Sequence, residues 1–145
     1  LQQAGADGVV LFNRFYQPDI DLDTLTIKPR IELSNPMESL LRIRWIALLR
    51  GRVDLSLAAT GGFHNVDEIL KALLAGADAV YLCSVLLEKG PSYYAALLQQ
   101  LRLWLEEREY ESVSQMKGSV SQACAIDPAA FEHSNYFDVI KSYKK

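Results

Sequence analysis

The chain has 145 residues, of which 50% are apolar and 23% charged, and its formal net charge is −3. This composition is typical of one folded domain and excludes an intrinsically disordered chain. No apolar run approaches the roughly 18 uncharged residues of a membrane-spanning helix, and no basic block offers a nucleic-acid surface. The two cysteines lack the spacing of a disulfide framework or a zinc site. We therefore expect a cytoplasmic protein with no nucleic-acid, membrane or metal partner, and residues 1–145 as a single partial domain, with further sequence upstream of Leu1.

Three short apolar segments, at residues 8–12, 53–60 and 80–82, predict β-strands. Two of them share a motif, AGADGVVLF at residues 4–12 and AGADAVYLC at residues 75–83. In each copy a glycine ends a helix and a strand follows at once. Continuous apolar runs of this kind are typical of parallel strands buried on both faces.

Helical patterns separate these strands. A helix is predicted over residues 36–52, and the residues expected on its buried side are Leu40, Leu41, Trp45, Leu48 and Leu49. A second helix begins after Asn65, which forms a capping box with Glu68. An amphipathic helix is predicted over residues 91–108, and the tail over residues 110–145 is predicted to be helical in two pieces, the second opened by Asp127 and Pro128.

The order of strands and helices predicts a parallel α/β fold. The exception is residues 19–33, whose alternating pattern predicts a small β excursion on the surface. A doubly wound sheet and a (β/α)₈ barrel both fit this order. A complete barrel needs about 250 residues, so three strands would form only the last part of one.

The candidate functional site is a pair of loops that follow neighbouring strands. Gly61 and Gly62 come directly after the strand at residues 53–60, and Ser84 comes after the strand at residues 80–82. Glycines at such a place let backbone amides approach an anion, and a serine adds a hydroxyl. The glycine pair alone is also compatible with a simple tight turn. Together, however, the two loops favour a phosphate site of the kind found after strands seven and eight of (β/α)₈ barrels.

Three further polar residues lie near the ends of the strands. Asn13 follows the first strand and offers both a donor and an acceptor to a planar ligand, although it is also a common turn residue. Arg14 is either an anion contact or a solvated loop residue. His64 is expected to be exposed at the start of a helix, with contact to a phosphate as the alternative.

These segments resemble the C-terminal half of the dihydroorotate dehydrogenases, FMN-dependent (β/α)₈ enzymes of pyrimidine synthesis. The resemblance rests on AGADGVVLFNRF, on the block from SLAATGGFHNVDE to SVLLEKGPSYY, and on YESVSQMKGSVSQ in the tail. It implies that the three strands are the sixth, seventh and eighth of the barrel. It also implies that Gly61, Gly62, Cys83 and Ser84 hold the FMN phosphate and that Asn13 contacts the substrate, dihydroorotate or a similar small molecule.

The chain also departs from this family. Arg14 stands where the family usually has serine or threonine, and the segment at residues 33–43 lacks the glycines of the family's loop before the sixth helix. The catalytic base and the lysine under the flavin belong to earlier strands, so no residue of this chain is expected to be catalytic. We therefore expect an FMN-binding oxidoreductase of this type, inactive as this chain alone, which forms a homo-oligomer. The alternatives are a phosphate-binding barrel enzyme without flavin and a flavin-binding protein that has lost its chemistry.

Overall fold

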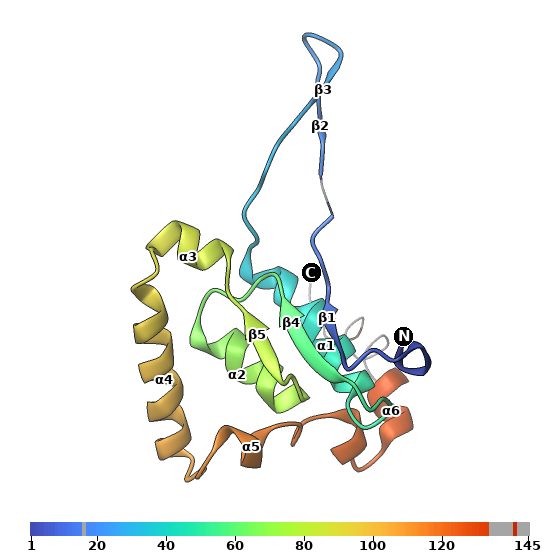
Figure 1. The fold of residues 1–145 in the computed structure, drawn as a ribbon, viewed down its shortest axis with the longest axis vertical. Helices are drawn as coiled ribbons and strands as arrows, with labels where there is room; N and C mark the ends of the chain where they lie inside the picture. The colour runs from blue at the N-terminus through green and yellow to red at the C-terminus, as the bar shows by residue number, and fades with distance from the viewer. Residues whose placement is uncertain (16, 134–140, 142–145) are drawn as a thin grey trace.

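The computed structural model describes residues 1–15, 17–133 and 141, and its centre is a three-stranded parallel sheet (Figure 1). The strands are β1 (Gly8–Leu11), β4 (Ser56–Thr60) and β5 (Ala79–Tyr81), in the order β1-β4-β5. Ala58 lies beside Val10 on one side and beside Ala79 on the other. The three strands therefore lie side by side in the same order in which they occur in the sequence, as in the wall of a barrel.

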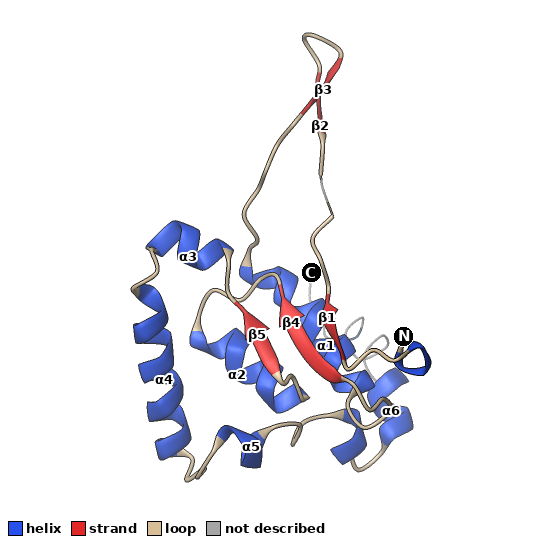
Figure 2. Cartoon of the chain, viewed as in Figure 1, coloured by secondary structure: helices blue, strands red, loops and turns tan. Residues whose placement is uncertain are grey.

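Helices follow β4 and β5 directly and continue into the tail, whereas a long segment separates β1 from its helix (Figure 2). Three short 3₁₀ helices accompany them, η1 (Gln2–Ala4), η2 (Pro36–Glu38) and η3 (Gln122–Cys124). The α-helices are α1 (Ser39–Leu49), α2 (Val66–Ala75), α3 (Ser84–Lys89), α4 (Tyr93–Glu107), α5 (Val113–Met116) and α6 (Pro128–His133). The predicted capping box of α2 is confirmed, because Asn65 accepts from the Asp67 amide and Glu68 accepts from the Asn65 amide. Asp127 caps the start of α6 as predicted, and residues 134–140 and 142–145 of the predicted helical tail lie outside the described residues.

The core lies on the face of the sheet that α1 and α2 cover. Leu57 and Ala59 of β4 point into it and meet Ile46 of α1 and Ala72 of α2. The prediction that the strands are buried on both faces is wrong for this chain, since Val10 on the opposite face is 47% exposed. The described helices cover one face only. The other face corresponds to the interior of a barrel, which three strands cannot close.

The helix predicted over residues 36–52 exists, but its buried side was misassigned. Ile46 and Ala47 are buried, whereas Leu40, Leu41 and Trp45 are exposed. Apolar residues lie all around this helix, so the hydrophobic pattern has no clear direction. The packing of β4 and α2 decides which side is covered. The remaining two leucines of the predicted side, Leu48 and Leu49, are partly buried.

The amino end of the sheet is closed by a cluster of charges around Asp78, from the second AGAD motif. Its carboxylate accepts from the Leu57 amide at 2.9 Å and pairs with Lys117 at 2.6 Å and Arg50 at 3.4 Å. Burial raises the pKa of Asp78, but the Lys117, Leu57 and Arg50 donors outweigh it and hold that pKa below its usual range. Gly76 has a φ of 117°, and a Cβ there would meet Cγ of Arg50 at 2.6 Å. The motif therefore has a structural role at this end.

The predicted β excursion is an antiparallel hairpin, β2 (Asp19–Asp21) and β3 (Thr26–Lys28), which projects away from the body (Figure 1). Ile20 lies opposite Ile27, and both are exposed. The chain then returns along residues 29–35 to the carboxyl end of the sheet, where it forms part of the cavity described below. Among the described residues, no helix has the length and apolar character needed to cross a lipid bilayer.

Candidate functional site

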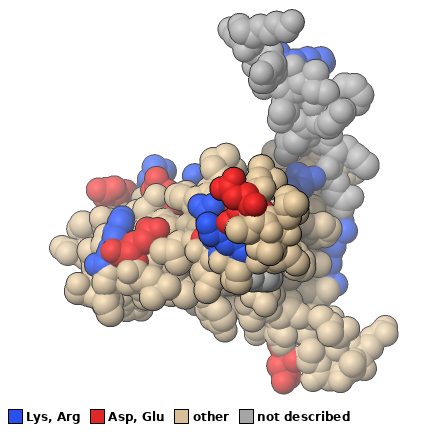
Figure 3. Space-filling model, turned by 90° about the horizontal axis from the view of Figure 1, so that it is seen from above, with Lys and Arg blue, Asp and Glu red and all other residues tan. Residues whose placement is uncertain are grey.

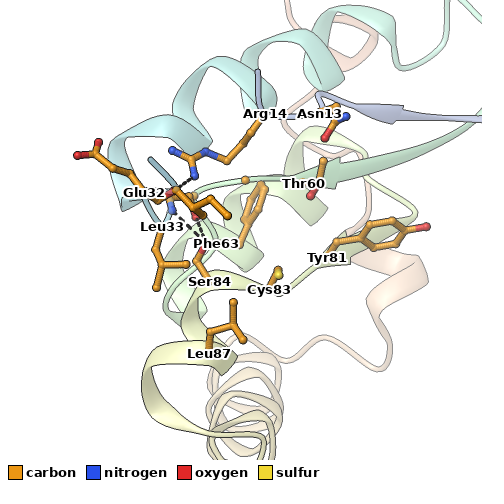
Figure 4. A pocket seen from close by; sticks show the side chains of 14 residues that line it. Asn13, Arg14, Glu32, Leu33, Thr60, Phe63, Tyr81, Cys83, Ser84 and Leu87 are labelled. Carbon is orange, nitrogen blue, oxygen red and sulfur yellow. Dashed lines mark hydrogen bonds between the residues drawn. The ribbon is translucent and has the colours of Figure 1, made fainter. Parts of the chain in front are cut away.

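A cavity of about 290 Å³ lies at the carboxyl end of the sheet (Figure 4). All five residues that the sequence analysis assigned to a site line it: Asn13, Gly61, Gly62, Cys83 and Ser84. They come from the loops after β1, β4 and β5, which end at the same edge because the strands are parallel. The predicted juxtaposition is therefore present. In Figure 4, Asn13 and Ser84 lie on opposite sides of the cavity, so a ligand that touched both would span it.

The glycine pair has a backbone that other residues adopt only with strain, since Gly61 and Gly62 both have a φ of 90°. A Cβ at Gly62 would lie 2.3 Å from the Ser39 amide nitrogen and 2.9 Å from the Asn35 carbonyl oxygen. Gly62 is therefore needed for the close packing of η2 and the start of α1 against the loop. This packing role and a role in ligand binding are compatible, because the same turn lines the cavity.

The hydroxyl of Ser84 is held by Ser34, a residue that the sequence analysis did not assign. The Ser34 amide donates to Ser84 Oγ at 3.0 Å, and the Ser34 hydroxyl donates to the same oxygen at 2.9 Å (Figure 4). A hydroxyl has two lone pairs and one proton. With both lone pairs engaged, the proton of Ser84 is the part of this group left to bind an acceptor in the cavity.

His64 is buried behind these serines, which corrects the expectation that it is exposed. Its Nε2 lies 3.1 Å from Ser34 Oγ, and its side chain is one-tenth exposed. Its backbone amide donates to Glu68, as does that of Asn65. These two amides at the start of α2 are thus already engaged, and this helix end has fewer donors for an anion than its sequence predicts.

Arg14 has features of both roles considered for it, anion contact and loop residue. It lines the cavity, and its guanidinium is bound to both oxygens of Glu38, at 3.1 and 3.3 Å, and to the carbonyl of Glu32. Glu38 also pairs with Arg42 at 3.7 Å, so this one carboxylate faces two guanidinium groups. On the face shown in Figure 3, basic and acidic side chains likewise lie next to one another rather than in patches of one sign.

The described residues give no sign of a metal centre, because no group of three His, Cys, Asp or Glu side chains is arranged to hold an ion within them. Cys83 and Cys124 are free and exposed, and Cys83 precedes Ser84 at the rim of the cavity. The return segment of the hairpin was the part of the site missed from sequence. Ser34 is 50 residues from Ser84 in the chain, and no spacing or motif connects the two.

The sequence is similar to catalytic subunits of dihydroorotate dehydrogenase B (NAD(+)). The protein from Listeria welshimeri is 31% identical over 122 residues, which cover 81% of this chain and 39% of the relative. The protein from Methanothermobacter thermautotrophicus is 24% identical over the same length, covering 40% of the relative. This chain thus spans about two fifths of the length of these curated relatives. A search of family models found no match.

The fold has a counterpart among solved structures. The structure of DHODH from Eimeria tenella in complex with ferulenol matches with a TM-score of 0.62 at 19% identity, over 80% of this chain and 31% of that one. At this identity the match concerns the fold alone, and it supports the α/β fold as an open part of a (β/α)₈ barrel. The chain is therefore related, over most of its length, to a segment of the dihydroorotate dehydrogenases.

Proposed function

We propose that this chain forms the phosphate-binding part of an FMN-dependent oxidoreductase of the dihydroorotate dehydrogenase type. The observation that carries the proposal is the cavity in which the Gly61–Gly62 turn after β4 and the Cys83–Ser84 loop after β5 meet. Two such loops at the carboxyl ends of adjacent strands are the usual phosphate site of a (β/α)₈ barrel. The relatives named above are the second support.

The residues present fit the phosphate end of FMN. Ser84 offers a hydroxyl proton, and the glycines allow a close backbone approach. The cavity of about 290 Å³ is at the small end of the range for ligand pockets, roughly 300–1,000 Å³. It suits the phosphate end of FMN better than the entire cofactor. The bound flavin would supply the redox chemistry on a dihydropyrimidine such as dihydroorotate, while this chain binds and orients.

Asn13 is proposed as the contact to the substrate. It lies across the cavity from Ser84 (Figure 4), where a ligand held at its phosphate end by Ser84 would extend. Its amide can donate and accept at once, as a carboxylate–imide ligand requires. No residue of the chain is proposed as catalytic, because neither free cysteine has a base positioned to activate it among the described contacts. We expect the chain alone to bind without turnover.

FMN binding tests the proposal through quenching of flavin fluorescence, with riboflavin as a matched ligand that lacks the phosphate. We expect FMN to bind this chain at least tenfold more tightly than riboflavin. Equal binding of the two ligands would contradict a phosphate site. Equal competition by inorganic phosphate and by FMN, with no gain from the flavin, would instead favour the phosphate-binding enzyme without flavin.

We also propose that the chain associates with copies of itself. β1 and β5 are the outer strands of the sheet, so each has an edge without a strand beside it in the described part of the chain. Val10 and Tyr81 on these strands are about half exposed, and such edges pair readily with other strands. Light scattering is expected to give a mass above that of the monomer. A stable monomer with a cooperative thermal transition would contradict this proposal.

A further inference from the structure

His64 makes two contacts that the binding of a phosphate by Gly62 and Ser84 does not explain. Its Nε2 lies 3.1 Å from Ser34 Oγ, and its Nδ1 lies 3.6 Å from Oε2 of Glu88 on α3. Both ring nitrogens of this buried imidazole thus face oxygen atoms.

The number of protons on the Ser34 hydroxyl fixes the direction of its hydrogen bonds. The Ser34 hydroxyl donates its only proton to Ser84 Oγ. The contact between Ser34 Oγ and His64 Nε2 is therefore a hydrogen bond only if Nε2 carries a proton and donates it. The chain of donors runs from His64 through Ser34 to Ser84, and the last proton in it belongs to the Ser84 hydroxyl that faces the cavity.

The second nitrogen faces a carboxylate. In the neutral ring with a proton on Nε2, the lone pair of Nδ1 would face the carboxylate of Glu88 across 3.6 Å, which is repulsive. In the charged ring, Nδ1 also carries a proton, and both contacts become attractive. The geometry around His64 is thus complementary to the imidazolium form.

Two carboxylates near His64 would stabilise a positive charge on its ring. Glu88 on α3 faces the ring, and Glu68 on α2 accepts from its backbone amide. On the cavity side, Arg14 and Arg42 both pair with Glu38, at 3.1 and 3.7 Å, and Glu32 pairs with Arg30. One carboxylate thus faces two guanidinium groups, which leaves about one positive charge for a phosphate dianion, and a protonated His64 would add a second.

We propose that His64 is a positioning residue of the phosphate site, whose protonated form a bound phosphate monoester dianion stabilises. The imidazolium polarises Ser34, Ser34 holds both lone pairs of Ser84, and the Ser84 proton is directed at the phosphate. Hydrogen bonds from charged donors are roughly twice as strong as neutral ones. This inference rests on the proposed function, because it names the group that balances the phosphate charge.

The test compares FMN binding by the chain and by H64Q at about pH 6.5 and about pH 8.5, between which imidazole loses its proton while phosphate stays mainly dianionic. The glutamine amide can still donate to Ser34, but it cannot titrate. We expect the chain to bind FMN about fivefold more weakly at the higher pH, whereas H64Q has nearly the same affinity at both. An equal pH dependence in H64Q would overturn the inference, and riboflavin serves as the ligand without a phosphate.

A second measurement needs no variant. In proton NMR, FMN is expected to make His64 keep its proton to higher pH by about half a unit or more, while riboflavin leaves its titration unchanged. If FMN binds more tightly than riboflavin but does not change the titration of His64, the role of His64 is contradicted. The proposed phosphate site is then still supported. FMN that binds no better than riboflavin contradicts the proposed function itself, and the inference with it.

Discussion

The two ends of the parallel sheet differ in what their side chains contact. At the amino end, Asp78 closes the structure by joining β4, the end of α1 and the loop that contains Lys117. At the carboxyl end, the loops after the strands leave a cavity lined by glycines and hydroxyls, with His64 buried behind it. In a (β/α)₈ barrel the first end serves stability and the second end serves ligands. The proposed phosphate site would give this partial barrel the same division.

The division is not absolute, and Gly62 shows where it fails. G62A is expected to destabilise the chain by about 2–5 kcal/mol, because it combines left-handed strain with a clash against a packed backbone. Its Cβ would lie 2.3 Å from the Ser39 amide nitrogen. Chemical denaturation measures the loss.

G5A is the matched control for this substitution. Gly5 has a left-handed φ of 86°, similar to that of Gly62, but a Cβ there has no atom within 4 Å. It is expected to lower the stability by about 1–2 kcal/mol, from strain alone. Equal losses of stability in the two variants would show that Gly62 is not required for packing. Its role would then be limited to the proposed ligand site.

Asp78 provides the corresponding test at the amino end. D78N keeps an acceptor for the Leu57 amide but removes the charge that faces Lys117 and Arg50, and it is expected to lower stability by about 1–2 kcal/mol at neutral pH. Because the folded state holds the pKa of Asp78 below its usual value, its charge stabilises the fold above about pH 4. That contribution disappears as the pH falls through the lowered pKa.

The difference in stability between the chain and D78N should therefore shrink in acid, which thermal denaturation from about pH 7 down to about pH 3 would measure. FMN affinity at neutral pH should be unchanged in D78N. A loss of FMN affinity in a variant that remains folded would show that the two ends are not independent.

S84A changes the carboxyl end of the sheet and is expected to have the smallest effect of these substitutions. The alanine removes the hydroxyl that faces the cavity, so FMN affinity is expected to fall about fivefold to tenfold, the usual effect of one hydrogen bond to a charged group. Riboflavin affinity should stay the same. Thermal stability is expected to fall by only about 1 kcal/mol, because the amide and hydroxyl of Ser34 lose Ser84 Oγ as their acceptor but water in the cavity can replace it. Equal losses for both flavins would place the phosphate elsewhere.

Local signals predicted most of the fold. Asn65 and Glu68 fixed the start of α2, Gly76 marked its end, and the short apolar runs gave the three strands. The two glycine and serine loops could be assigned to one site because parallel strands end at the same edge. Each of these predictions depends on residues that are neighbours in sequence or on a rule of topology.

The sequence did not predict what depends on contacts between distant segments. The exposed side of α1 at Trp45 follows from which elements pack on it, and the burial of His64 follows from the return of the hairpin to the sheet. Ser34 reaches the site across 50 residues of chain. A motif search cannot detect such a residue, because its role is defined by the fold.

The question that matters most is whether a phosphate binds between the loops after β4 and β5. Amide NMR of the chain during a titration with FMN answers it, with riboflavin as the reference. We predict that FMN shifts the amide signals of Gly61, Gly62, Cys83 and Ser84 and that riboflavin does not. Shifts confined to the amino end around Asp78, or identical shifts with both flavins, would contradict the proposed phosphate site.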